Sequence, residues 1–430
     1  MADNKRPLLR GLAWLLLLAP FFFTSYSFTN WLSEQRSDVG VVVFDWEHAI
    51  PFVPWSIVPY WFIDLFYGVS LLMPRSRDEL DAHAKRLFTA QIISVLCFIV
   101  VPLHFSFQRP DTTGLSGWMF DVLLGFDKPF NQAPSLHISL LVILWTLYAR
   151  YLTGCWLWLT RLIAIAIGLS VLTTYQHHFI DLPTGALVGC IAVLLFPLQS
   201  QTAIIQRDPH RFVLGGYYLA SALLLAVLAL FLKGVWLWLL WGTCAFTVVA
   251  IIYFLGNPLL FRNPNGRMEE AVLVLLAPYL LGAWLNSRCW TRKHPEPSEI
   301  VSGLWLSRLP DRSVITQLQP VALVHCCAEL PVISCGQPVY GVPMLDLLAP
   351  EVAQIEQGVA AIKAGQQVGN VLVFCALGYS RSAVLIIASL IEQGQAATID
   401  EAIDKVRKAR PRLVLSALHR TRLEQWYEKR

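Results

Sequence analysis

Charged residues are scarce in this sequence. They make up 14% of its 430 residues, whereas hydrophobic residues make up 56%, and soluble proteins usually contain about 25% charged residues. The scarcity is uneven, because long apolar runs fill residues 8–285 and charges return at an ordinary density only after Ser287. The composition therefore excludes a soluble fold for most of the chain. A net charge of only +4, with no basic cluster among aromatic residues, also argues against nucleic acid as a partner.

The apolar runs predict a polytopic membrane protein, because a helix that crosses a bilayer needs about 20 mainly apolar residues. Eight runs reach this length, at residues 8–30, 50–73, 87–108, 135–153, 155–175, 180–198, 212–232 and 235–256. A ninth run at 271–286 is shorter and contains Pro278, so we expect a re-entrant or surface helix there. No cleavage motif of small residues follows the first run, which predicts a retained span rather than a signal peptide.

The charges of the loops predict the orientation, since basic loops face the cytoplasm. Basic residues precede the first span and fill the loop after the second, at Arg10, Arg75, Arg77, Lys85 and Arg86. Eight spans then place both ends of the chain in the cytoplasm, a reducing compartment that suits nine cysteines. We expect a multi-pass protein of the cell inner (plasma) membrane, with a membrane domain at 1–290, a linker at 291–300 and a soluble domain at 301–430. The sequence does not indicate the oligomeric state.

The soluble domain contains a motif suited to binding a phosphate group. Residues 370–374 predict a short buried strand and residues 383–391 an apolar helix, and the segment between them runs from Cys375 to Ser382. A tight loop between a strand and a helix points backbone N–H groups at an anion. We therefore expect the loop to bind phosphate through the residues Ala376, Leu377, Gly378, Tyr379 and Ser380.

Three side chains of this motif predict phosphoryl transfer by a thiolate. Cys375, at the mouth of the loop, would have a lowered pKa and act as the nucleophile. Arg381 would hold two phosphate oxygens with its planar guanidinium, and Ser382 would donate a hydrogen bond to the sulfur. The alternative for Cys375 alone is a buried structural thiol, because free cysteines are often buried.

The departing oxygen needs a proton, and Asp346 is the candidate general acid. It follows a second expected strand and precedes an expected helix at about 350–364, so it lies on a loop. The same carboxyl group would then act as the base for the water that completes the reaction. The alternative is that Asp346 is a turn or cap residue, as loop aspartates often are.

The Cys-x5-Arg-Ser motif after a strand, with an aspartate about 29 residues earlier, resembles the dual-specificity branch of the protein tyrosine phosphatases. The resemblance runs from about Ser302 to Trp426 and includes the late helix before Pro411. It implies an α/β domain with a central sheet flanked by helices, a cysteinyl-phosphate intermediate, and no metal or other cofactor. The family usually has histidine before the cysteine, whereas this chain has Phe374, which predicts a higher thiol pKa and a slower enzyme.

Three short motifs of the membrane half lie on the outer side of the predicted topology. They are Arg109-Pro110, Pro134-Ser135-Leu136-His137 and His177-His178-Phe179-Ile180-Asp181. His177 would attack phosphorus, and Asp181, four residues later and so on the same helix face, would hold its ring in the attacking tautomer. His137 would protonate the leaving alcohol, while Arg109 and Ser135 would bind phosphate oxygens. The alternative is that these histidines are solvated loop residues and that Pro-Ser is an ordinary helix start.

These motifs resemble the type 2 phosphatidic acid phosphatase superfamily over roughly residues 50–200. The resemblance implies an all-α transmembrane bundle with a six-span core and a site that faces away from the cytoplasm. The lysine expected seven residues before Arg109 is Pro102, and the arginine expected after Ser170 is Val171. The loss of these two cations brings the site closer to the related sphingolipid-type phosphotransferases.

Together, the two resemblances predict a bacterial-type fusion that acts as a membrane-bound phosphatase on phosphorylated lipids. Its expected partners are membrane lipids and a phosphorylated lipid or phosphoprotein substrate. Two alternatives stay open for the membrane half. It could transfer a phospho-headgroup between lipids, or it could be an inactive anchor or lipid sensor that controls a protein phosphatase.

Overall fold

The structure, a computed structural model, describes residues 7–125, 127–198, 202–333 and 336–430. The chain divides into two compact units, Met1–Ser200 and Gln201–Arg430. The linker expected at 291–300 lies inside the second unit, so three apolar helices share that unit with the α/β domain.

Helices dominate the described part of the first unit. They are α1 (Leu8–Glu34), α2 (Ile57–Ser70), α3 (Arg77–Val100), α4 (Gly114–Leu124), α5 (Leu136–Tyr151), α6 (Gly154–Thr173) and α7 (Asp181–Leu195). The packing of α7 on α5 depends on two glycines, because a Cβ on Gly185 would lie 2.4 Å from Ser135 O and one on Gly189 would lie 2.7 Å from Ser139 O. Small residues let helices approach closely, and here they bring the first turns of α5 and α7 together.

The loop that was expected after the second span is shorter than predicted. Helix α3 begins at Arg77, so Lys85 and Arg86 belong to a helix and not to a loop. Arg86 is fully buried, and its guanidinium donates hydrogen bonds to Val193 O and Phe196 O at the end of α7. The last carbonyls of a helix lack partners within it. Arg86 is therefore a packing residue that caps α7, which its charge alone did not reveal.

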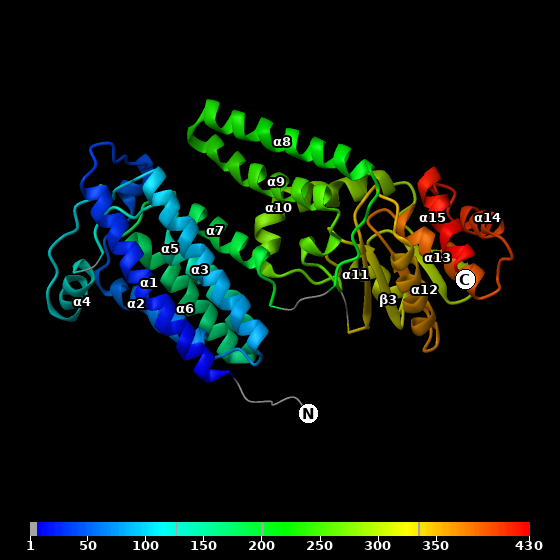
Figure 1. Ribbon diagram of the computed structural model, residues 1–430, viewed down its shortest axis with the longest axis horizontal. Coiled ribbons are helices and arrows are strands. Elements are labelled where there is room, and N and C mark those ends of the chain that lie inside the picture. Colours follow the sequence, from blue (N-terminus) through cyan, green and yellow to red (C-terminus); the bar gives the residue numbers. More distant parts are fainter. Residues whose placement is uncertain (1–6, 126, 199–201, 334–335) are drawn as a thin grey trace. The chain divides into compact units, whose positions relative to one another are not determined.

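The second unit begins with three apolar helices. Helices α8 (His210–Leu232) and α9 (Leu239–Leu255) run side by side as a hairpin, joined by the 3₁₀ turn Gly234–Trp238 (Figure 1). Helix α10 (Glu270–Thr291) continues through Pro278 and has 22 residues, so the short, interrupted helix predicted at 271–286 was wrong. Asn263, before α10, donates to Leu330 O, and Ser287, near its end, donates to Ala376 O. Both ends of this segment therefore contact the α/β domain.

Six helices among the described residues are long and apolar enough to cross a membrane. They are α1, α3, α6, α8, the segment Gly234–Leu255 and α10. The predicted spans at 50–73, 135–153 and 180–198 contain the shorter helices α2, α5 and α7, which have 14, 16 and 15 residues. The apolar window at 50–73 is longer than its helix because it includes the 3₁₀ turn Pro54–Ser56.

The α/β domain is built on a mixed sheet with the strand order β1-β2-β5-β3-β4. Its strands are β1 (Ser298–Val301), β2 (Leu304–Ser307), β3 (Ala322–Cys327), β4 (Val339–Met344) and β5 (Val371–Phe374). Its helices are α11 (Arg312–Leu318), α12 (Val352–Gln366), α13 (Arg381–Glu392), α14 (Ile399–Ala409) and α15 (Ala417–Glu428). Strand β1 pairs antiparallel with β2, and the other pairs are parallel. The central place of β5 puts Cys375 at the carboxyl edge of the sheet, between β2 and β3.

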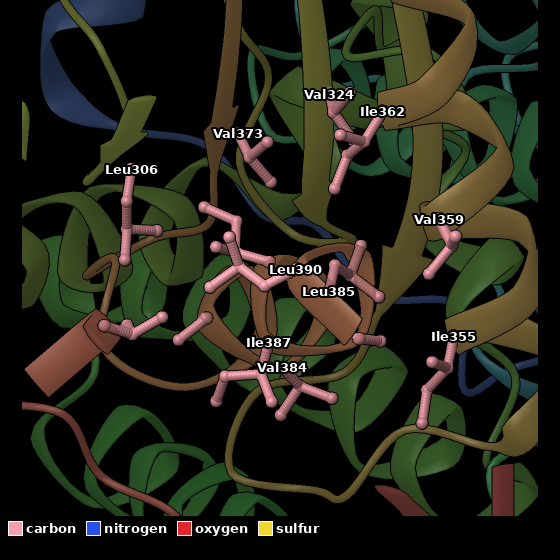
Figure 2. Packing of buried hydrophobic residues seen from close by; sticks show 14 of the residues in the cluster. Leu306, Val324, Ile355, Val359, Ile362, Val373, Val384, Leu385, Ile387 and Leu390 are labelled. Atoms are coloured by element: carbon pink, nitrogen blue, oxygen red, sulfur yellow. The ribbon is translucent and has the colours of Figure 1, made fainter. Parts of the chain in front are cut away.

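Helix α13 lies at the centre of the domain. All its residues from Arg381 to Ile391 are buried, and Leu385, Ile387 and Leu390 belong to the same apolar cluster as Val324 of β3 and Val373 of β5 (Figure 2). A helix that is apolar on every side has to be covered on every side, and the sheet with α12, α14 and α15 provides that cover. This packing fixes the N-terminus of α13, where the loop that begins at Cys375 ends.

Candidate active sites

The loop from Cys375 to Arg381 joins β5 directly to α13, as the sequence predicts. Gly378 is required in it for two reasons. Its φ of +71° lies in the left-handed region that favours glycine, and a Cβ there would lie 2.5 Å from Ser307 O at the end of β2. The loop curls around the sulfur of Cys375, which accepts a hydrogen bond from Gly378 N–H at 3.2 Å.

The carbonyl groups of the loop are held from outside. The oxygens of Ala376, Leu377 and Tyr379 accept hydrogen bonds from groups beyond the loop. The C=O and N–H groups of one planar trans peptide point in opposite directions, so the N–H groups that follow these carbonyls face the concave side. Such a ring of N–H groups at a helix N-terminus binds an anion.

Cys375 is only 3% exposed, and its surroundings favour the thiolate. Burial opposes ionisation, but the positive charge of Arg381 and the hydrogen bonds from Ser382 and Gly378 outweigh it and lower the pKa of Cys375. The Ser382 hydroxyl donates to the sulfur at 3.2 Å. Burial raises the pKa of Cys326 and Cys327 well above the usual range, so these neighbouring thiols stay protonated.

The histidine that lies beside Phe374 does not supply a cation to the thiol. Phe374 precedes Cys375, and its ring packs beside His325 of β3, with 5.2 Å between the ring centroids. Burial lowers the pKa of His325 to about 4, and its Nε2 bonds to Leu330 O. His325 is therefore neutral at physiological pH, whereas the charge of Arg381 lowers the pKa of Cys375.

Arg381 is 1% exposed, and two carboxylates hold its guanidinium. Glu329 accepts from Nη1 at 2.9 Å and from Nη2 at 2.8 Å, while Asp346 Oδ1 lies 2.9 Å from Nη2. Met344 O also accepts from Nη1, at 2.8 Å. Sequence reasoning missed Glu329. A carboxylate just after the buried strand β3 could have marked Glu329 as a candidate. Its contact with Arg381 depends on the pairing of β3 with β5, which could not be read from the sequence.

Asp346 lies on the loop between β4 and α12, with 29% of its side chain exposed. Burial raises the pKa of this carboxyl group; Arg381 opposes the shift and Glu329 reinforces it, so the pKa stays above its ordinary value. A carboxyl group with a raised pKa keeps its proton closer to neutral pH, as a general acid needs. Its contact with Arg381 places it next to the loop that would bind phosphate.

In the first unit, His177 and Asp181 meet at the start of α7. His177 Nδ1 lies 3.1 Å from Asp181 Oδ2, and Ser135 N–H donates to Asp181 O at 3.0 Å. The contact forms in a turn, because His177 lies before the first residue of α7. The prediction that both residues share one helix face was therefore wrong, although the pair itself is present. The Ser135 hydroxyl accepts from Ile138 N–H and caps α5.

The neighbouring His178 holds the loop in place. Its Nε2 accepts a hydrogen bond from Ser106 N–H at 3.1 Å, which leaves Nδ1 to donate to Glu47 at 3.2 Å. Burial lowers the pKa of His178, although Glu47 opposes the shift. Both ring nitrogens are engaged, so His178 is not a free nucleophile.

The other predicted residues of this site, His137 and Arg109, come from other segments of the first unit. His137, in the first turn of α5, stacks on Tyr60 of α2 with 4.1 Å between centroids, and its Nε2 has no hydrogen-bond partner among the described residues. The guanidinium carbon of Arg109 lies 4.5 Å from the centre of the Phe120 ring.

A further carboxylate, Asp127, belongs to the same region. Burial raises its pKa to about 6, and the charges of His177 and Arg109 oppose the shift. Sequence reasoning missed Asp127 because it is a single loop residue outside any motif. Tertiary packing alone brings Asp127 near His177.

A buried thiol that has a lowered pKa, accepts a hydrogen bond from an N–H group of its loop and lies beside an arginine is the arrangement that phosphoryl transfer by a cysteine requires. The family model "Dual specificity phosphatase, catalytic domain" matches residues 319–429. This part of the chain therefore contains a dual-specificity phosphatase domain, and the matched residues include Asp346, Cys375 and Arg381.

Similar solved structures include human DUSP28 and PTPMT1. Human DUSP28 has 23% identity and a TM-score of 0.30, with 31% of this chain and 95% of that chain covered. PTPMT1 has 21% identity and a TM-score of 0.28, again with 31% and 95% covered. Tk-PTP in the active form has 21% identity and a TM-score of 0.27, with 32% and 99% covered. No curated protein matches the chain.

Proposed function

We propose that this protein is a membrane-bound phosphatase that removes phosphate from lipids through Cys375. The observation that carries the proposal is the Cys375 thiol, which lies in the N–H ring of its loop with Arg381 beside it. Arg381 and the loop bind the phosphate oxygens. No metal or cofactor takes part in the proposed reaction.

The proposed reaction has two steps. The Cys375 thiolate attacks phosphorus and forms a cysteinyl-phosphate, while the bond to the leaving oxygen breaks and Asp346 gives that oxygen its proton. Asp346 then takes a proton from water, the water oxygen attacks phosphorus, and the thiolate leaves with inorganic phosphate released. Asp346 now occupies a donor of Arg381, so we expect phosphate to displace it towards the leaving group.

The lipid substrate is proposed from the surroundings of the catalytic domain. Ser287 of α10 bonds to Ala376 of the catalytic loop, and Tyr253 of α9 donates to Asp346 O. Helices α8, α9 and α10 are each apolar enough to enter a bilayer. A headgroup anchored in that bilayer would therefore be held close to Cys375. Because the segment before α10 and the last turns of α10 both contact the α/β domain, we propose that α10 does not carry the domain across the membrane and that the domain is cytoplasmic.

A second phosphatase site is proposed in the first unit. His177 would attack phosphorus with Asp181 orienting its ring, His137 would protonate the leaving group, and Arg109 with Ser135 would bind phosphate oxygens. The contact between His177 and Asp181, beside the first turn of α5, supports this assignment. It gives the protein two catalytic groups of different chemistry for phosphorylated lipids.

The test measures phosphate release from phosphatidic acid and phosphatidylglycerophosphate by full-length protein in lipid nanodiscs. The variants are Cys375→Ser, His177→Ala and the double mutant. Cys155→Ser and His294→Ala, both at exposed positions, are the matched controls. Partial loss in each single variant and complete loss in the double variant is the expected result.

Two other outcomes would change the proposal. If Cys375→Ser alone abolishes release, the first unit is an anchor or lipid sensor and the histidine site is rejected. If neither lipid is hydrolysed while a phosphotyrosine peptide is, the lipid substrate is rejected and the protein is a protein phosphatase.

A further inference from the structure

The loop that carries Asp346 is held by residues outside the matched phosphatase domain. Gln206, which precedes α8, accepts from Leu345 N–H at 2.6 Å and donates to Ala349 O at 3.1 Å. Asp208 accepts from Ala349 N–H at 2.9 Å. The two residues therefore fix the loop on both sides of Asp346.

A third contact reaches Asp346 itself. The Tyr253 hydroxyl, at the end of α9, donates to Asp346 O at 3.2 Å. Gln206 is fully buried and Tyr253 is 1% exposed, so these bonds form away from water, where a lost hydrogen bond is costly. We call Gln206, Asp208 and Tyr253 the hairpin clamp.

The two chain segments at the base of the α8–α9 hairpin contact each other directly. Gln206 N–H donates to Gly256 O at 2.8 Å, directly after α9. Gly256 has a φ of +64°, and a Cβ there would lie 2.3 Å from Gln206 O. This close approach joins the segment before α8, which carries Gln206 and Asp208, to the end of α9, which carries Tyr253.

We infer that the hairpin clamp positions Asp346 for proton transfer. The base of the α8–α9 hairpin then contributes positioning residues to the phosphatase site. The inference rests on the general-acid role proposed above for Asp346. Its carboxyl group has to move from Arg381 to the leaving oxygen while its backbone stays in place. The clamp supplies that fixed backbone through the bonds at Leu345, Asp346 and Ala349.

Positioning of a general acid has a signature that a purely structural role lacks. Proton donation matters most when the leaving group is a strong base, and least when the leaving group is a stable anion. A poorly placed Asp346 should therefore slow the hydrolysis of phenyl phosphate much more than that of 4-nitrophenyl phosphate, because phenol is the weaker acid.

The experiment measures kcat/KM for both aryl phosphates with full-length protein in nanodiscs, because kcat also includes hydrolysis of the cysteinyl-phosphate, which is the same for both substrates. Tyr253→Phe removes only the hydroxyl, Gln206→Ala removes two bonds, and Tyr217→Phe, at an exposed position on α8, is the matched control. We expect the ratio of the two rates to shift by about tenfold in Gln206→Ala and by less in Tyr253→Phe. Thermal unfolding monitors folding, and the ratio is independent of the fraction of folded enzyme.

A double-mutant cycle separates this inference from the proposed function. In an Asp346→Asn background, Gln206→Ala should shift the ratio no further, since the asparagine that Gln206 would position cannot donate a proton to the leaving oxygen. If Gln206→Ala and Tyr253→Phe lower both rates equally or leave both unchanged, the clamp is not a positioning device. If Asp346→Asn itself leaves the ratio unchanged, the general-acid role fails and the clamp inference falls with it.

Discussion

The two candidate sites of this molecule are built in different ways. The cysteine site in the second unit comes mostly from one stretch of eight residues, Cys375 to Ser382, between a strand and a helix. The histidine site in the first unit takes residues from the starts of α5 and α7 and from two loops, separated by as many as 72 positions between Arg109 and Asp181. A continuous site keeps its geometry through local backbone structure, whereas a dispersed site depends on how whole helices pack.

The two sites also differ in their cations. Arg381 contacts Asp346 directly and lowers the pKa of Cys375. Arg109 instead lies over Phe120. The two further cations that the family resemblance predicts are replaced in this chain by Pro102 and Val171. Phosphoryl transfer depends on positive groups around the transferred phosphate. We therefore expect the cysteine site to be the stronger catalyst, and the following predictions test that difference.

The largest effect is expected from Cys375→Ser on a soluble aryl phosphate. Loss of the thiolate should lower kcat by at least about 10³-fold, because serine in this loop has no base to ionise it. The assay is hydrolysis of 4-nitrophenyl phosphate, with Cys155→Ser as the control. Substantial activity left in Cys375→Ser would mean that the histidine site also accepts soluble phosphates, which would remove the proposed difference.

Arg381→Lys should lower kcat/KM by about 10²-fold on the same substrate. Lysine keeps the charge but lacks the planar fork that holds two oxygens at once, and it cannot keep both bonds to Glu329. Steady-state kinetics of this variant beside the exposed Arg407→Lys provide the check. If Arg381→Lys were as active as Arg407→Lys, Arg381 would serve only as a positive charge. The difference in phosphate-binding cations between the two sites would then be unimportant.

Glu329→Gln should destabilise the second unit by about 3 kcal/mol, because it breaks a buried ion pair and leaves Arg381 without a bidentate partner. Thermal unfolding of the full-length protein would show this as a lower Tm. Glu428→Gln, at an exposed position on α15, is a suitable control. An unchanged Tm would contradict the view that Glu329 holds Arg381 in place.

The pH dependence should report on two groups of the cysteine site. Activity should rise as Cys375 loses its proton, at a pH below that of an ordinary thiol, because its pKa is lowered. Activity should fall at higher pH as Asp346 loses its proton, since its pKa is raised and the acid form is required. In Asp346→Asn the decline at high pH should disappear. A decline that persists would assign it to another group.

The smallest effect is expected from His177→Ala on phosphatidic acid hydrolysis. A loss of about twofold or less in total release, independent of the loss in Cys375→Ser, would fit a weaker second catalyst. The comparison uses nanodiscs, with His294→Ala as the control. A greater loss than in Cys375→Ser would reverse the proposed ranking of the two sites.

Several features were predictable because they depend on neighbouring residues. The strand at 371–374, the loop from Cys375 and the helix from Arg381 follow from a β-rich apolar run, a glycine and an apolar periodic segment. Helix lengths were less predictable. Apolar windows overestimated α2, α5 and α7 because hydropathy does not mark turns, and Pro278 did not interrupt α10.

The sequence by itself determined the apolar helices and the strand, loop and helix around Cys375, since each of these is encoded within a short continuous segment. Only the tertiary structure decided that Glu329 holds Arg381, that Asp127 lies near His177, and that Gln206 and Tyr253 hold the loop of Asp346. These contacts join residues 50 or more positions apart. Such contacts are set by strand order and helix packing, which bury distant side chains together and are not written in any local pattern.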